Sequence, residues 1–213
     1  MGIDDHSRKG SAAPAPPLAA FDFDGTLTVR DSFRAFLAWR FDTLRLTSGL
    51  LRLTPAFLRY AWNQDRGGLK ASLVAEFLAP RSIVELEADA ERFADAEAHN
   101  LFRPDAVATW REWGERGARR VIVTASPDVL VAPFARRLGA DALLGTRLGL
   151  DAQGRLTGAL DGPNCRGAEK VVRLKAAFGE DLRLAAAYGD TAGDREMLAI
   201  AEAPGYRVFR GKP

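Results

Sequence analysis

The sequence contains a single cysteine, Cys165, among 213 residues. One cysteine cannot form a disulfide within the chain, which favours a reducing compartment. No segment reaches the roughly 18 consecutive apolar residues of a membrane-spanning helix, and the N-terminus lacks the apolar run of a signal peptide. The net charge is only +2, which gives no general case for nucleic-acid binding. We therefore expect a cytoplasmic protein without a nucleic-acid partner.

Regular alternation of secondary structure begins near residue 18. Residues 1–17 are polar and rich in alanine and proline, and we expect a disordered tail there. Strands are predicted at 18–23, 120–124, 182–188 and 206–209, an irregular hairpin at 143–160, and helices at 104–116, 127–138, 169–178 and 194–200. Residues 31–100 carry helical signals only, among them a capping box formed by Ser82 and Glu85.

Strands that alternate with helices predict a mostly parallel sheet covered on both faces. The helical block interrupts this alternation directly after the first strand. We therefore predict an α/β protein with a doubly wound, Rossmann-like core, formed by residues 18–30 and 101–213. Residues 31–100 would form an inserted helical cap.

Polar residues follow three of the predicted strands. Asp22 and Asp24 follow the first, Thr124 closes the second, and Asp190 and Asp194 follow the third. Ligands of such sheets bind beyond the carboxyl ends of the strands, so these side chains should share one crevice. Buried carboxylates need cations, and a set of oxygen ligands with few histidines or thiols suits Mg²⁺.

These segments resemble the four motifs of the haloacid dehalogenase superfamily, in the same order. Asp22-Phe23-Asp24-Gly25-Thr26 is similar to the first motif and Thr124 to the second. Lys170 is similar to the third, and the run from Gly189-Asp190 to Asp194 to the fourth. The resemblance covers the core from about residue 18 to 209, while the cap matches by position and helical character alone.

The resemblance implies a role for each of these residues. Asp22 would attack phosphorus and form an aspartyl-phosphate, and Asp24 would act as general acid and base. Thr124, the following Ala125 and Lys170 would bind the phosphoryl group. The metal ligands would be Asp22, the backbone carbonyl of Asp24, Asp190 and, directly or through water, Asp194.

Asp24 also indicates the class of reaction. The dehalogenases of the superfamily lack this second aspartate, whereas its phosphatases keep it to protonate a leaving alkoxide. The sequence thus predicts a Mg²⁺-dependent phosphomonoester hydrolase. The alternatives are a phosphotransferase to an alcohol acceptor, and a catalytically silent module that binds phosphate or a membrane surface.

The position of the cap resembles subfamily IB, which contains the phosphoserine phosphatases. Those enzymes usually carry glutamate where this chain has Asp31, and Ser-Gly-Gly where it has Thr124-Ala125-Ser126. The Asp31-Ser32-Phe33 and Thr124–Pro127 segments resemble more closely a bacterial branch that includes the C-type phosphatidylglycerophosphate phosphatase. The substrate would be a small phosphorylated metabolite or a phospholipid head group, and Asp31 is a candidate to contact it.

The first part of the cap combines arginines with apolar residues. Arg45, Arg52 and Arg59 are seven residues apart and would share one face of a continuous helix. Such a helix could pack its apolar side on the core and leave the arginines in solvent. Alternatively, a basic amphipathic helix could contact an anionic membrane from its inner face.

Overall fold

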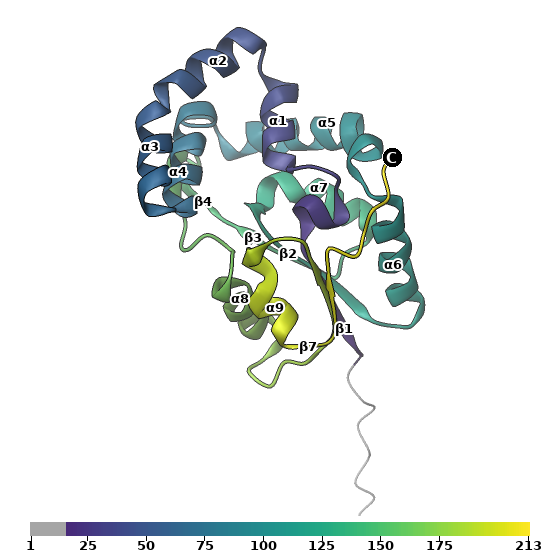
Figure 1. The fold of residues 1–213 in the computed structure, drawn as a ribbon. Helices are drawn as coiled ribbons and strands as arrows, with labels where there is room; N and C mark the ends of the chain where they lie inside the picture. Colours follow the sequence, from purple (N-terminus) through teal and green to yellow (C-terminus); the bar gives the residue numbers. More distant parts are fainter. Residues whose placement is uncertain (1–15) are drawn as a thin grey trace, which may run out of the picture.

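The computed structural model describes residues 16–213, and most of the predicted tail, residues 1–15, lies outside the described residues. A five-stranded sheet forms the centre of the molecule, in the order β3-β2-β1-β6-β7 (Figure 1). The strands are β1 (Leu18–Phe21), β2 (Arg119–Pro127), β3 (Ala142–Thr146), β6 (Leu184–Gly189) and β7 (Ala201–Tyr206). All four pairings between neighbours are parallel.

The sheet is buried on both faces, as the two sides of β1 show. Ala19 and Phe21 belong to a core cluster with residues of α6 (Pro104–Glu115) and α7 (Asp128–Leu138). Leu18 and Ala20 point the other way, into a cluster with residues of α8 (Ala168–Phe178) and α9 (Arg195–Ala199). This arrangement, with helices on both faces of a parallel sheet, confirms the predicted doubly wound α/β fold.

Five helices connect the end of β1 to the start of α6. They are α1 (Ser32–Arg40), α2 (Thr43–Arg52), α3 (Thr54–Asn63), α4 (Arg66–Phe77) and α5 (Ile83–Leu101). Aspartates at the N-caps of α1, α2 and α4 accept bonds from backbone N–H groups, and Ser82 and Glu85 form the predicted capping box of α5. Whether residues 31–100 behave as a separate domain stays a prediction.

A buried charge cluster holds this helical segment together. Asp89 of α5 is 1% exposed and forms ion pairs with Arg40 and Arg81, each at 2.7 Å, and with Arg92. These partners come from the end of α1, the α4–α5 connection and α5 itself. One carboxylate therefore joins three segments of the chain.

Two predictions of strands were wrong. Residues 143–146 belong to β3 in the central sheet, and only β4 (Leu148–Leu150) and β5 (Leu156–Leu160) form the hairpin. The last strand is β7 rather than residues 206–209. Pro204 lies within β7, which a proline tolerates because β7 is an edge strand with one neighbour.

The hairpin links the helical segment to the sheet. Strand β5 packs on α4, and the backbone of Ser82 pairs with that of Arg155 just before β5. Gly158 has a φ of +85°, and a Cβ there would lie 2.7 Å from Cβ of Ala75 on α4.

Within residues 16–213, the helices are either too short or too polar to cross a membrane.

Candidate active site

The loops after β1 and β6 and the C-terminal end of β2 meet at one edge of the sheet and line a cavity of about 530 Å³. Asp22 follows β1 directly, and its N–H donates to the carbonyl of Tyr188 in β6 at 2.8 Å. Thr124 lies where the pairing of β2 with β3 becomes irregular, and Asp190 follows β6. Helix α8 supplies Lys170. All four predicted motifs therefore contribute residues to this cavity.

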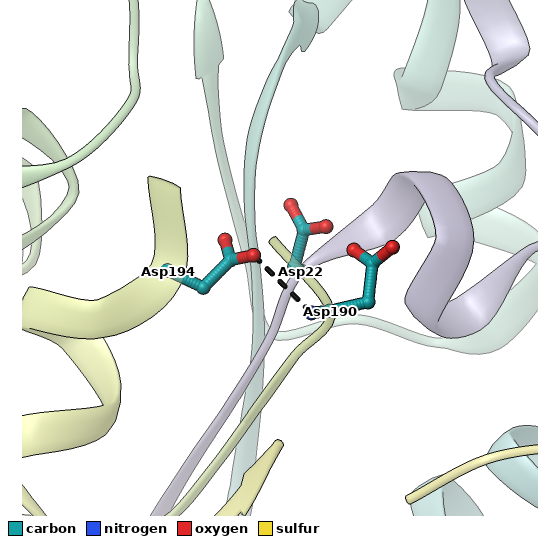
Figure 2. A group of neighbouring side chains, drawn as sticks. All are labelled: Asp22, Asp190 and Asp194. Carbon is teal, nitrogen blue, oxygen red and sulfur yellow. Dashed lines mark hydrogen bonds between the residues drawn. The ribbon is translucent and has the colours of Figure 1, made fainter. Parts of the chain in front are cut away.

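Three carboxylates form the acidic group at the base of the site. One carboxylate oxygen each of Asp22, Asp190 and Asp194 lie within 4.8 Å of one another (Figure 2). Asp194 Oδ2 accepts bonds from the N–H groups of Asp190, at 3.2 Å, and Thr191, at 2.8 Å. Asp194 thereby shapes the loop that presents Asp190.

Lys170 provides the positive charge among these carboxylates. Its Nζ donates to Asp22 Oδ1, to Asp194 Oδ1 and to the carbonyl of Val123, each at 2.6 Å. The side chain is 1% exposed. All three ammonium donors are thus satisfied, and one lysine connects residues that follow or belong to β1, β2 and β6.

Burial and charge shift the pKa values of these groups in different directions. Burial raises the pKa of Asp22 to about 7, and Asp194 adds to this while Lys170 opposes it. Burial and the charge of Asp194 also raise the pKa of Asp190. For Asp194 the effect of burial is outweighed by Lys170, and the pKa is lowered. The two carboxylates raise the pKa of Lys170 against its burial, which keeps the lysine protonated.

Asp24 lies on the same loop but faces other partners. Its Oδ1 accepts a bond from the N–H of Ser32 at 2.6 Å, and its Oδ2 one from the hydroxyl of Ser126. Burial, followed by the charge of Asp31, raises the pKa of Asp24 to about 6. A carboxyl group with this pKa can both give and take a proton near neutral pH, as general acid–base catalysis requires.

The carboxylates of the acidic group fit a hard divalent cation. Their net charge is negative even with Lys170 included, and oxygen ligands of this kind suit Mg²⁺. Gly25 lets the two loops approach, because a Cβ at this position would lie 2.3 Å from Asp190 Oδ2. The carboxylate of Asp24 lies outside this group, so its predicted contact with the metal rests on the backbone carbonyl alone.

The predicted phosphate-binding residues line the cavity beside Asp22. The Oγ1 of the buried Thr124 accepts a bond from the N–H of Ser126 at 3.0 Å, which leaves the hydroxyl hydrogen available to an acceptor in the cavity. Ala125 belongs to the same lining. Asp31 also lines the cavity, although its carboxylate caps α1 by accepting a bond from the N–H of Arg34 at 2.7 Å.

Other cations line the cavity that no sequence motif predicted, and these are Arg34, Arg66, Lys70 and Arg166. Lys70 reaches from α4 to the carbonyl of Ala125 and to Oδ1 of Asn164, the latter at 3.0 Å. Burial lowers the pKa of Lys70 to about 8, which the charges of nearby Asp24 and Asp31 oppose. No sequence motif identifies these cations, because α4 meets the C-terminal end of β2 only in the folded chain.

Cys165 has no part in this chemistry. The thiol is buried, and burial raises its pKa to about 11, so the reactive thiolate is disfavoured. Cys165 instead packs in the core cluster that contains residues of β2 and β6.

Comparisons with known proteins agree with this geometry. The profile of the haloacid dehalogenase-like hydrolases matches residues 19–199. The Protein CicA of Caulobacter vibrioides is 59% identical over 204 residues, which cover 96% of this chain and 91% of that protein. SerB1 of Mycobacterium tuberculosis, described as a phosphoserine phosphatase, is 29% identical over 87% of this chain and 64% of its own length.

Solved structures share the fold. A protein of unknown function from Bordetella pertussis has a TM-score of 0.72 at 26% identity and covers 89% of this chain and 88% of its own. A substrate-bound phosphoserine phosphatase has a TM-score of 0.58 at 21% identity, over 91% of this chain and 86% of its own. With the profile spanning most of the sequence, the chain belongs to the haloacid dehalogenase-like hydrolase family, which confirms the predicted superfamily and class of enzyme.

Proposed function

We propose that the protein is a Mg²⁺-dependent phosphomonoester hydrolase that forms a covalent phosphoryl intermediate on Asp22. The observation that carries this proposal is that two neighbouring aspartates have different bonding partners. Asp22 is bonded to Lys170 in the acidic group, whereas Asp24 is held by Ser32 and Ser126 away from it. A site that only bound phosphate would have no need of the second group.

The first half of the reaction transfers the phosphoryl group to the protein. A carboxylate oxygen of Asp22 forms a bond to phosphorus as the bond from phosphorus to the substrate oxygen breaks. Asp24, in its protonated form, gives its proton to the departing alkoxide. Thr124 donates a hydrogen bond to a phosphoryl oxygen, and the positive charge of Lys170, which is bonded to Asp22, stabilises the negative charge that moves between Asp22 and the phosphoryl group.

The second half returns the protein to its starting state. Asp24 takes a proton from a water molecule, whose oxygen attacks phosphorus and releases phosphate and the carboxylate of Asp22. A bound Mg²⁺, held by Asp22, Asp190 and the carbonyl of Asp24, would neutralise the charge of the phosphate and of the acidic group. Asp194 orients Lys170 and the loop of Asp190 throughout.

The cations of the cavity favour a substrate with a second anionic group. Arg34, Arg66 and Lys70 come from the helical segment, opposite the phosphate-binding loops of the core. A phosphate diester or a carboxylate next to the phosphomonoester would neutralise them, and Asp31 could accept a bond from an ammonium or hydroxyl group. Phosphoserine and phosphorylated phospholipid head groups both meet this description, and relatives described as phosphoserine phosphatases support the first.

Hydrolysis of p-nitrophenyl phosphate tests the proposal. We expect turnover that requires Mg²⁺, disappears with EDTA and falls by at least about 10³-fold in Asp22→Asn. Asp181→Asn changes an exposed carboxylate outside the cavity and should match the wild type. Beryllium fluoride, which mimics the phosphoryl group, should bind to the carboxylate of Asp22 in the wild type and should not bind in Asp22→Asn. Full activity in Asp22→Asn would refute the mechanism.

Product analysis identifies whether water or an alcohol accepts the phosphoryl group. With glycerol present, a hydrolase releases free phosphate in step with p-nitrophenol, whereas a phosphotransferase also forms glycerol phosphate. We expect phosphate and p-nitrophenol in equal amounts. Glycerol phosphate as the main product would favour the alternative, transfer to an alcohol.

A further inference from the structure

Helices α2 and α3 present their apolar residues to solvent. Leu44 is 83% exposed, Leu51 68%, Leu58 67% and Trp62 92%. Leu44 and Leu51 lie seven residues apart on α2, which is two helical turns, and Leu58 and Trp62 lie one turn apart on α3. Figure 1 shows both helices at the outer edge of the molecule, away from the sheet. Large exposed apolar side chains on two consecutive helices are typical of an interaction site.

The arginines of the same helices contact α4. Arg45 pairs with Glu76 of α4 at 2.7 Å and lies over the rings of Phe41 and Phe77. Arg52 pairs with the same glutamate at 2.9 Å, and Arg59 donates to the hydroxyl of Ser72 on α4 at 3.4 Å. The side chain of Arg52 is nevertheless 63% exposed and Arg59 is exposed too, while Leu53 and Ala56 belong to the core cluster. The expected arrangement, with an apolar side on the core and arginines in solvent, is thus present in part, and the exposed leucines form a second apolar side.

Contacts of Arg45 stabilise this orientation of α2. Its guanidinium group stacks on aromatic rings and pairs with a partly buried carboxylate, so moving it into solvent would cost more free energy than exposing an unpaired arginine. The fold thus fixes which side of α2 and α3 faces outward. The outward side keeps Leu44, Leu51, Leu58 and Trp62, which we call the outer apolar face.

The composition around this face suits an anionic lipid bilayer. From Thr43 to Asn63 every charged residue is an arginine. Exposed leucines beside a tryptophan, flanked by arginines alone, are the pattern of a helix that lies in a membrane interface.

One helix of the outer apolar face also lines the active site. Tyr60 of α3 lines the cavity, and Leu58 and Trp62 lie two residues away on the opposite side of the helix. Arg66 at the start of α4 lines the cavity too. A bilayer in contact with Leu58 and Trp62 would therefore be separated from the cavity by the width of α3.

We infer that the outer apolar face of α2 and α3 docks the protein on the surface of a bilayer that contains anionic phospholipids. The leucines and Trp62 enter the boundary between head groups and acyl chains, and the arginines contribute attraction to the anionic head groups. Docking does not require catalysis, so it holds for the inactive Asp22→Asn protein as well.

Co-sedimentation with vesicles tests this inference. Wild-type protein and Asp22→Asn should both sediment with vesicles of phosphatidylcholine mixed with phosphatidylglycerol, and less with phosphatidylcholine alone. Leu51→Glu and Leu58→Glu should each weaken the partition by about tenfold or more, since each replaces a leucine that would enter the bilayer by a charge. Val172→Glu, on an exposed position of α8, should bind as the wild type does.

Tryptophan fluorescence provides a second readout. Trp62 should shift its emission to shorter wavelength when anionic vesicles are added, and Trp62→Phe should lose this shift while it still sediments. Hydrolysis of soluble p-nitrophenyl phosphate should be equal in the wild type and Leu51→Glu, which shows that the variant is folded.

Three results would overturn the inference. The first is a wild-type protein that does not sediment with anionic vesicles, and the second is a pair of leucine variants that sediment as well as the wild type does. The third is a wild-type dimer in solution that does not bind vesicles and that Leu51→Glu converts to a monomer. In that case the face joins two copies of the chain.

Discussion

Asp22→Asn should make the metal-free protein more stable, although it removes the proposed nucleophile. The pKa of Asp22 is about 7 in the fold and 3.8 as its ordinary value, and burial is the main cause. Three pKa units correspond to about 4 kcal/mol, which is the largest cost that ionised Asp22 could impose on the fold above pH 7. Asparagine is neutral and of nearly equal size, and it can still accept the bond from Lys170.

The sign of the pH dependence follows from the raised pKa. Between about pH 4 and pH 7 the folded protein holds a proton on Asp22 that the unfolded chain has released. The free energy of unfolding of the wild type, measured in urea with EDTA, should therefore fall as the pH rises through this range. In Asp22→Asn, the contribution of Asp22 to this decrease in the free energy of unfolding should be absent. At pH 8 it should exceed the wild type by about 1–3 kcal/mol, since relaxation reduces the upper limit of 4.

Mg²⁺ should reverse the order of the two proteins. A ligand at 1,000 times its dissociation constant adds about 4.1 kcal/mol to the protein that binds it, which exceeds the expected lead of Asp22→Asn, and Asp22→Asn itself should gain little. Asp181→Asn, with an exposed carboxylate, is the matched control and should follow the wild type in every condition. The reasoning is refuted if Asp22→Asn is less stable than the wild type in EDTA at pH 8. The attraction between Asp22 and Lys170 would then outweigh the cost of burial.

Three further changes test other parts of the structure. Gly25→Ala should abolish Mg²⁺-dependent turnover, because its Cβ would displace Asp190 and its φ of +81° disfavours alanine; activity at saturating Mg²⁺ equal to the wild type would contradict this. Lys70→Met should raise KM at pH 7 by about tenfold for a substrate with two anionic groups. In the wild type kcat/KM for that substrate should fall above pH 8, where Lys70 loses its proton, and a profile that the variant leaves unchanged would exclude this role. Asp89→Asn should lower the free energy of unfolding at pH 7 by about 2–3 kcal/mol in urea, because three arginines lose a shared partner. Since the bonds to these arginines lower the pKa of Asp89 against its burial, that stabilisation should vanish in acid, and a difference that persists there would argue against it.

The sheet and the position of the site could be predicted because local signals determine them. A short apolar run that ends in Asp-x-Asp-Gly-Thr predicts a buried strand and a loop, and the loops of neighbouring parallel strands necessarily meet. Asp22, Asp190 and Lys170 therefore converge as expected. Their roles in catalysis stay predictions that the experiments above address.

Edge strands were predicted less well. Residues 142–146 and 201–206 each pair with one neighbour in the sheet, and Gly145 and Pro204 interrupt their apolar pattern. Strands at the edge depend on pairing with the chain beside them more than on their own composition. Their limits were consequently set by β2 and β6, which the sequence of the edge strands does not reveal.

The amphipathic pattern of α2 and α3 predicts two faces but does not decide which of them is buried. A stripe of leucines usually faces the core, and that expectation holds when the neighbouring surface is apolar. Here the neighbouring helix offers Glu76, and the aromatic rings of Phe41 and Phe77 lie beside it. These groups bind arginine better than they bind leucine, since a partly buried Glu76 without a cation would be costly. One carboxylate on α4 thus draws Arg45 and Arg52 toward α4 and leaves Leu44 and Leu51 exposed, and Glu76→Leu should weaken this preference and, with it, the binding of anionic vesicles.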